Sequence, residues 1–195
     1  PVDAPPRPTL YVTTGTSWQQ VATATAALMD VPGHVQAAMA LVDGADLPQE
    51  PRARVAAILR ALRDRVEGDW SSLDDGPLTP SDPQVVLASG HANVRDHAAL
   101  LHGALVGWGI DARLVLVDMG QGWSRVQLPG LTGFNHVLVR VEGPEPLWID
   151  PTDAVTPLGE LPRSLQGRPA LVLDPATTDR VTTPAAPPDQ STIER

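Results

Sequence analysis

The chain has 195 residues, no cysteine and a formal net charge of -9, which arises from 23 acidic residues and 14 arginines, without lysine. The absence of cysteine excludes disulfides, thiolate metal sites and a cysteine nucleophile. Because a chain this acidic repels phosphate backbones, we expect no nucleic-acid partner. No apolar run approaches the roughly 18 residues that cross a bilayer, so we expect no membrane span.

Composition divides the chain into three parts. Residues 1–16 begin with a proline-rich segment and no Met, which we interpret as a linker from a longer protein, with 10–13 as a candidate edge strand. Residues 17–173 carry the periodic apolar pattern of a folded domain. Residues 174–195 are rich in Pro, Thr and Asp, and predict a flexible tail.

The first half of the chain predicts helices. Ser17 and Gln20 have the spacing of a capping box before a helix over 18–29, and 33–42 predicts a short helix or a loop. Pro51 favours the start of an amphipathic helix, and a second short helix is expected after 79–82. The apolar stripe of the amphipathic helix is Val55, Ile58, Leu59, Leu62 and Val66, and its expected solvent face is Arg52, Arg60, Arg63 and Asp64.

A further helix is expected to be the buried centre of the domain. Asn93 is a good N-cap, and Gly107 or Gly109 can take the left-handed conformation at the other end. Because the helix is apolar on most sides, we expect other elements to cover it.

The second half of the chain predicts strands. The aliphatic run 112–118 is typical of a strand buried on both faces, 170–173 is a final aliphatic run, and 135–141 and 147–150 form a hairpin. A turn centred on Gly143 would pair Val139 with Leu147 and would place His136 opposite Asp150. A carboxylate bound to imidazole orients a catalytic base, although such a pair also occurs as a simple surface contact.

Five short motifs follow one another along the chain: Ala92-Asn93-Val94-Arg95-Asp96, Gly109-Ile110-Asp111-Ala112, Phe134-Asn135-His136, Trp148-Ile149-Asp150-Pro151-Thr152-Asp153 and Gln166-Gly167-Arg168-Pro169-Ala170-Leu171. In this order they resemble the transglutaminase-like superfamily, whose core is papain-like. The likeness covers roughly residues 50–174 and is greatest to a bacterial branch whose central helix begins Gly-Asp-Cys-Lys-Asp.

The resemblance implies an α+β fold in which the central helix packs on an antiparallel sheet. It also implies that His136 is the general base, that Asp150 orients it, and that Val94 occupies the nucleophile position. Valine has no lone pair to donate, although it matches cysteine in size and polarity. We therefore expect a non-catalytic binding or structural module of a longer bacterial protein, with a protein or peptide as partner. Bacterial envelope or periplasm is the location that the resemblance implies.

Other functions are compatible with the sequence. An active acyltransferase or amide hydrolase would need His136, Asp150 and a substitute nucleophile, for which Asp96 and Ser89 are the nearby candidates. A purely structural spacer would have no ligand cleft beside the hairpin. His97 and His102 are five residues apart rather than the four that zinc helices use, so we predict no metal and no cofactor.

Overall fold

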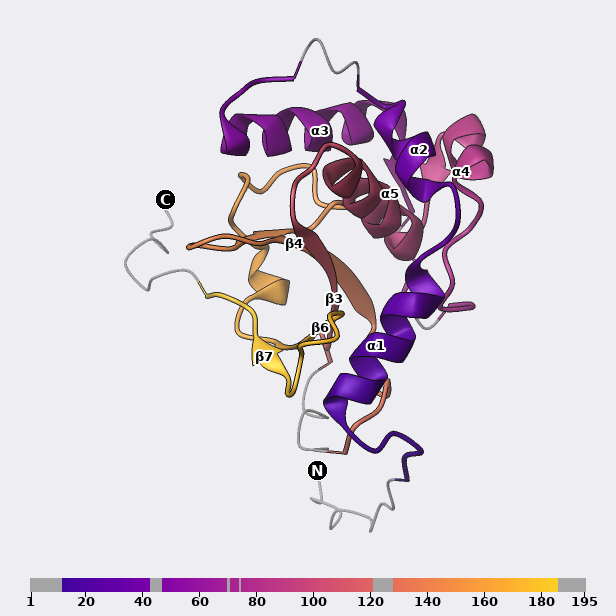
Figure 1. Ribbon diagram of the computed structural model, residues 1–195, viewed down its shortest axis with the longest axis vertical. Coiled ribbons are helices and arrows are strands. Elements are labelled where there is room, and N and C mark those ends of the chain that lie inside the picture. Colours follow the sequence, from indigo (N-terminus) through magenta and orange to yellow (C-terminus); the bar gives the residue numbers. More distant parts are fainter. Residues whose placement is uncertain (1–11, 43–46, 70, 74, 121–127, 186–195) are drawn as a thin grey trace, which may run out of the picture.

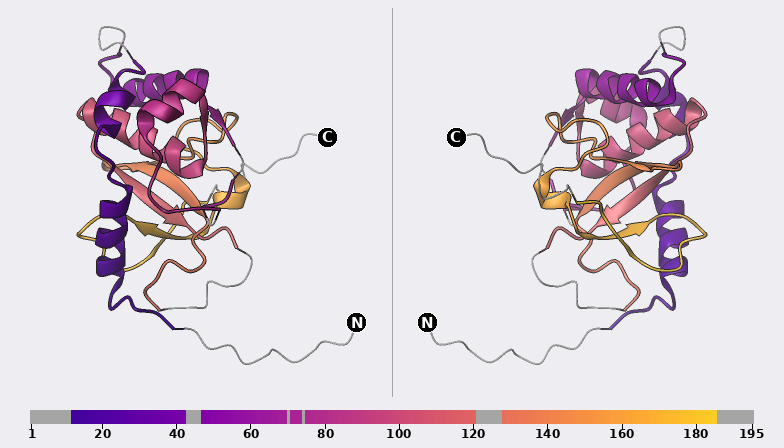
Figure 2. Two further views of the ribbon diagram at one scale, coloured as in Figure 1. Left: turned by 90° about the vertical axis from the view of Figure 1, so that its right-hand side faces the viewer. Right: turned by 90° about the vertical axis from the view of Figure 1, so that its left-hand side faces the viewer.

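The computed structural model describes residues 12–42, 47–69, 71–73, 75–120 and 128–185 (Figures 1 and 2). The fold is α+β, as expected, and is built on a five-stranded antiparallel sheet with the order β5-β4-β3-β6-β7. The helices are α1 (Trp18–Met29), α2 (His34–Met39), α3 (Pro51–Arg65), α4 (Pro83–Ser89), α5 (Val94–Gly107) and the 3-10 helix η2 (Arg163–Leu165). The strands are β1 (Glu67–Gly68), β2 (His91–Ala92), β3 (Ala112–Val117), β4 (His136–Val141), β5 (Leu147–Ile149), β6 (Pro169–Val172) and β7 (Val181–Thr182).

The predicted helix starts are confirmed by their caps. The Ser17 hydroxyl accepts the N–H of Gln20, whose side chain in turn accepts the N–H of Thr16. Glu50 caps α3 directly before Pro51, and the Asn93 side chain accepts the N–H groups of Arg95 and Asp96 at the start of α5. These side chains satisfy amides that have no partner inside the helix.

Helix α5 is buried as expected and lies between α3 and the sheet (Figure 1). Leu100, Leu101 and Leu105 have no exposed surface, and burial of each such side chain stabilises the fold by about 1.5–3 kcal/mol. Helix α2 crosses α5 at very short range at Gly103, where a Cβ atom would lie 3.1 Å from the carbonyl oxygen of His34. A larger residue at this position would push the two helices apart.

Strand β3 is buried on both faces, which confirms the prediction from its aliphatic run. Leu114 and Leu116 contribute to the larger core beneath the helices. Val115 and Val117 point into a second core on the opposite face, where Leu165 of η2 packs. The sheet therefore has no solvent face at its centre, and the chain after β5 must cover it.

The predicted register of the hairpin is wrong by two residues. Strand β4 pairs Val139 with Ile149 and Val141 with Leu147, so the loop is centred on Pro144 rather than Gly143. A shift of two residues leaves every side chain on its predicted face, and the alternating pattern therefore could not distinguish the two registers. Within the described residues, His136 and Asp150 are not paired partners in the ladder.

The prediction of a flexible tail is wrong for residues 174–185. Val181 pairs with Ala170 of β6, and Asp174 forms an ion pair with Arg113. Thr183 is 2% exposed, and its hydroxyl donates to the carbonyl of Leu165. Hydrogen bonds hold this segment where apolar burial is scarce. Of the predicted edge strand, residues 10 and 11 lie outside the described residues and residues 12 and 13 form no strand.

Candidate functional site

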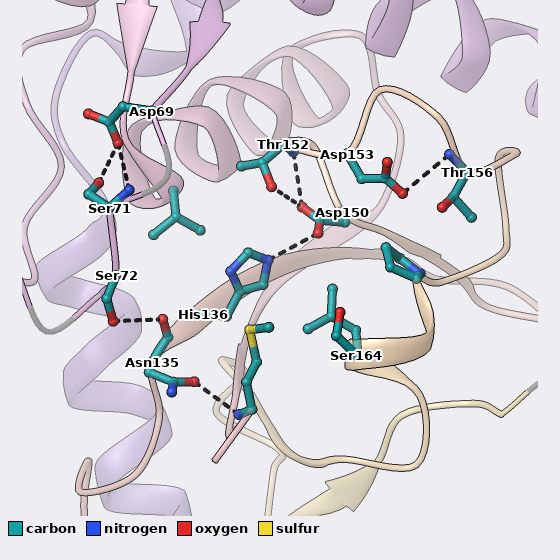
Figure 3. Close-up of a pocket in the computed structure, with 14 residues that line it drawn as sticks. Asp69, Ser71, Ser72, Asn135, His136, Asp150, Thr152, Asp153, Thr156 and Ser164 are labelled. Carbon is teal, nitrogen blue, oxygen red and sulfur yellow. Dashed lines mark hydrogen bonds and ion pairs between the residues drawn. The ribbon is translucent and has the colours of Figure 1, made fainter. Parts of the chain in front are cut away.

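A cavity of about 470 Å³ lies where the start of α5 meets the start of β4 and the chain that follows β5 (Figure 3). We call this cavity the cleft. The three residues that the resemblance singles out, Val94, His136 and Asp150, all lie on its walls. The remaining lining residues are Asp69, Ser71, Ser72, Met119, Asn135, Thr152, Asp153, Thr156, Pro162, Ser164 and Leu165.

His136 and Asp150 form a hydrogen-bonded pair in the wall of the cleft. Nε2 of His136 lies 3.2 Å from Oδ2 of Asp150, and the two side chains are 14% and 7% exposed. Thr152 binds the other carboxylate oxygen through its hydroxyl at 2.7 Å and its N–H at 3.0 Å. Figure 3 shows the carboxylate held between the ring and Thr152.

The ionisation of Asp150 determines which ring nitrogen of His136 carries the lone pair. Burial is the largest influence on the pKa of Asp150 and opposes ionisation, but the hydrogen bonds from His136 and Thr152 outweigh it, and the pKa lies below its usual value. An ionised Asp150 accepts the Nε2 proton, so Nδ1 of a neutral His136 carries the lone pair. In Figure 3 Nδ1 is turned away from Asp150.

Val94 is the first residue of α5 and is 2% exposed. The helix dipole and the neighbouring imidazole would favour a thiolate at such a position. The valine side chain offers only methyl groups there, and it fills the position without a polar group that would need a partner. The α5 start therefore contributes an apolar surface to the cleft.

The substitute nucleophiles that the sequence suggested are not on the cleft wall. Asp96 is 3% exposed and accepts hydrogen bonds from the N–H of Ser81 and the side chain of Asn93. Ser89 donates to the carbonyl of Val86 at the end of α4. Both residues therefore have local structural partners away from the lining of the cleft.

Sequence reasoning missed the hydroxyl groups that do line the cleft. Ser71 donates to Asp69, and Ser72 donates to the carbonyl of Asn135 at 3.4 Å. Ser164 lies on the wall that η2 forms. These residues belong to irregular segments, where no apolar periodicity indicates which side chains face inward.

The expected solvent exposure of Arg63 is also wrong. Its guanidinium is half-buried and donates from Nη2 to the carbonyl oxygens of Asp150, at 3.2 Å, and Asp153. Burial lowers the pKa of Arg63, while Asp153 and Asp150 oppose that effect. Arg63 therefore fastens α3 to the turn that carries Asp150. Arg52, Arg60 and Asp64 are exposed as predicted.

Two further histidines, His97 and His102, have structural contacts with backbone carbonyls. Nε2 of His97 lies 3.1 Å from the Val66 carbonyl, and Nε2 of His102 lies 3.2 Å from the Ala112 carbonyl. Burial lowers the pKa of both. Across the described ranges, no group of three or more His, Cys, Asp or Glu residues is placed to hold a metal ion. None of the helices in the described part has the length and apolar character to cross a membrane.

No protein-family model matches the sequence, and no curated protein matches it either. One solved structure is similar in fold, with a TM-score of 0.65 and 17% sequence identity. It is a "putative protease" from Parabacteroides distasonis, and the match covers 89% of this chain and 32% of that one. This chain thus spans about a third of the length of its structural neighbour. The likeness is one of fold and is consistent with an α+β papain-like core.

Proposed function

We propose that this domain is a non-catalytic transglutaminase-like module that binds a protein or peptide in the cleft. The observation that carries the proposal is Val94, which stands at the start of α5 on the wall that also holds His136 and Asp150. A nucleophile at this position needs a lone pair, which valine lacks. Asp150 orients the imidazole of His136, but position 94 supplies no nucleophile for it to activate. This arrangement supports a binding role better than it supports acyl transfer.

The cleft has features that suit an extended peptide. Hydroxyl and amide side chains on its walls can bind a peptide backbone, and Val94, Met119 and Leu165 provide apolar surface for a side chain. The resemblance supports a place for this module in a longer bacterial envelope protein that has further domains. The residues that form it are 17–173, together with the ordered segment 174–185.

The test compares turnover and binding in the same preparation. Purified domain is incubated with a casein-derived peptide mixture and a primary amine, and both peptide cleavage and amine incorporation are followed by mass spectrometry. We expect no turnover, and retention of a subset of the peptides on immobilised domain. Turnover that is lost in the His136→Ala variant would contradict the proposal.

An active hydrolase with a serine nucleophile is a second candidate, because the hydroxyls of Ser71, Ser72 and Ser164 line the same cleft as the His136 pair. A fluorophosphonate probe distinguishes the two functions. The second candidate predicts that the probe labels one of these serines and that His136→Ala prevents the labelling. An unlabelled protein would exclude this candidate.

A further inference from the structure

We propose that the cleft selects a peptide with a positively charged side chain, a lysine or an arginine. This inference rests on the proposed function and adds the chemical class of the ligand. The cleft lining includes three carboxylates, Asp69, Asp150 and Asp153, and among its described lining residues there is no arginine. The chain has 14 arginines, so their absence from this lining is not a matter of composition.

Three carboxylates at another part of the sheet, Asp111, Asp174 and Glu142, have an arginine partner. Arg113 contacts both Asp111 and Asp174, and Arg140 lies 2.7 Å from Glu142. These pairs lie at the end of the sheet where β3 begins and β4 ends, away from His136. Within the described residues, the side chains of Asp69, Asp150 and Asp153 form no ion pair with an arginine side chain.

The contacts of the cleft carboxylates are made mostly with neutral donors, which do not cancel their charge. Asp150 is bound by His136 and Thr152, and Asp153 accepts the N–H groups of Val155 and Thr156. Arg63, which does not line the cleft, interacts favourably with Asp153 and Asp150 and partly offsets their charge. The cleft therefore keeps a net negative charge when His136 is neutral.

Asp69 is the carboxylate best placed to bind a cation. Its Oδ1 atom accepts the N–H of Ser71 at 3.1 Å and also the Ser71 hydroxyl, and both bonds orient the carboxylate without adding a positive charge. Among the described contacts, none involves Oδ2 of Asp69. Figure 3 shows Asp69 and Asp153 on opposite sides of His136, so a ligand that lies across His136 meets a carboxylate on either side.

An apolar surface accompanies this charge. Val94, Met119, Pro162 and Leu165 line the same cleft. Lysine and arginine have long aliphatic stems that pack on apolar surface while the charged end stays hydrated. The combination of methyl groups and carboxylates without an arginine ion pair fits such a side chain better than it fits a short neutral or an acidic one.

The test uses three peptides that differ in one residue, acetyl-Ala-Leu-X-Leu-Ala-amide with lysine, norleucine or glutamate at X. Binding to the whole domain is measured by calorimetry at low ionic strength. We expect the lysine peptide to bind about fivefold more tightly than the norleucine peptide and the glutamate peptide to bind most weakly, with a difference that shrinks as salt is added.

Two variants separate a local effect from overall charge. Asp69→Asn keeps an oxygen for Ser71 but removes one negative charge, and we expect the preference for lysine to fall about twofold or more. Asp64→Asn changes the net charge equally at an exposed site on α3 and should leave the preference unchanged. Equal affinities for the lysine and norleucine peptides would overturn this inference but leave peptide binding intact. If none of the three peptides binds, both this inference and the proposed function fail.

Discussion

His136 and Asp150 meet on a diagonal of the β4–β5 ladder, with Nε2 of His136 3.2 Å from Oδ2 of Asp150. The ladder pairs Val139 with Ile149, so the two residues are displaced by two positions along the strands. Cross-strand diagonals remain within reach of long side chains. The chain after β5 also contributes, because Thr152 binds the second oxygen of the carboxylate.

Removing the charge of Asp150 should weaken the fold in a pH-dependent way. We expect Asp150→Asn to lower the free energy of unfolding by about 2 kcal/mol at pH 7, because it replaces a buried carboxylate that accepts several hydrogen bonds. The pKa of Asp150 is lowered in the folded state, so its stabilisation is fully present above the unfolded value of about 3.9 and is lost as the pH falls through the folded pKa.

Urea titrations of both proteins between pH 7 and pH 2 measure this difference. The exposed Asp64→Asn variant on α3 serves as control and should match the unmodified protein within about 0.5 kcal/mol. A stability difference for Asp150→Asn that stays constant down to the lowest pH would argue against ionisation of Asp150 as its source.

A thiol in place of Val94 should be unusually acidic. The Val94→Cys substitution is close to isosteric, and the chain has no other cysteine, so any labelling by iodoacetamide reports on this position alone. We expect a thiol pKa well below the usual value of about 8.5, because the helix N-terminus and the imidazole of His136 favour the thiolate. The pH dependence of the alkylation rate measures it.

The His136→Ala change in the Val94→Cys background isolates the contribution of the imidazole and should raise the thiol pKa. If the thiol of Val94→Cys titrates as an ordinary cysteine, the cleft does not retain the geometry of a cysteine-dependent site. That outcome would favour a purely structural role for the His136–Asp150 pair.

Arg63 should stabilise the turn that carries Asp150. Arg63→Ala removes the donor to the carbonyls of Asp150 and Asp153, and we expect a loss of about 2 kcal/mol in the free energy of unfolding. Arg60→Ala on the exposed face of the same helix is the matched control, with an expected change below about 0.5 kcal/mol. Equal effects in urea unfolding would show that the contacts of Arg63 contribute nothing specific.

Buried histidines should make the fold sensitive to mild acid. His97 is 2% exposed, and burial lowers its pKa, so the unfolded chain takes up a proton at a higher pH than the folded protein does. The stability contributed by neutral His97 is therefore complete above about pH 6.5 and declines below it, with a slope of at most about 1.4 kcal/mol per pH unit. His97→Gln should reduce that slope.

Chemical denaturation at pH 7.5, 6.5 and 5.5 provides the measurement. His91, whose side chain is 70% exposed, supplies the control through His91→Gln, which should leave the slope unchanged. His34 and His102, whose pKa values burial also lowers, would keep part of the slope in the His97→Gln variant. An identical slope in His97→Gln and the unmodified protein would refute the assignment.

Local chemistry in the sequence determined the elements of this domain. The caps at Ser17 and Asn93, the proline at position 51 and the aliphatic run of β3 each act over a few residues, and α1, α5, α3 and β3 formed where these signals predicted them. The alternation of the hairpin also determined the faces of its side chains correctly. These signals depend on neighbours in the chain, which is why they can be recognised without a structure.

Tertiary structure alone decided what surrounds the His136–Asp150 pair. The hairpin register depended on the loop, because a two-residue shift leaves an alternating pattern unchanged. Arg63 reached the turn after β5, and Asp69 and Ser164 reached the cleft, from segments distant in sequence. Likewise, residues 174–185 are held by Arg113, β6 and the Leu165 carbonyl. Such contacts depend on how the elements pack, and no local pattern encodes them.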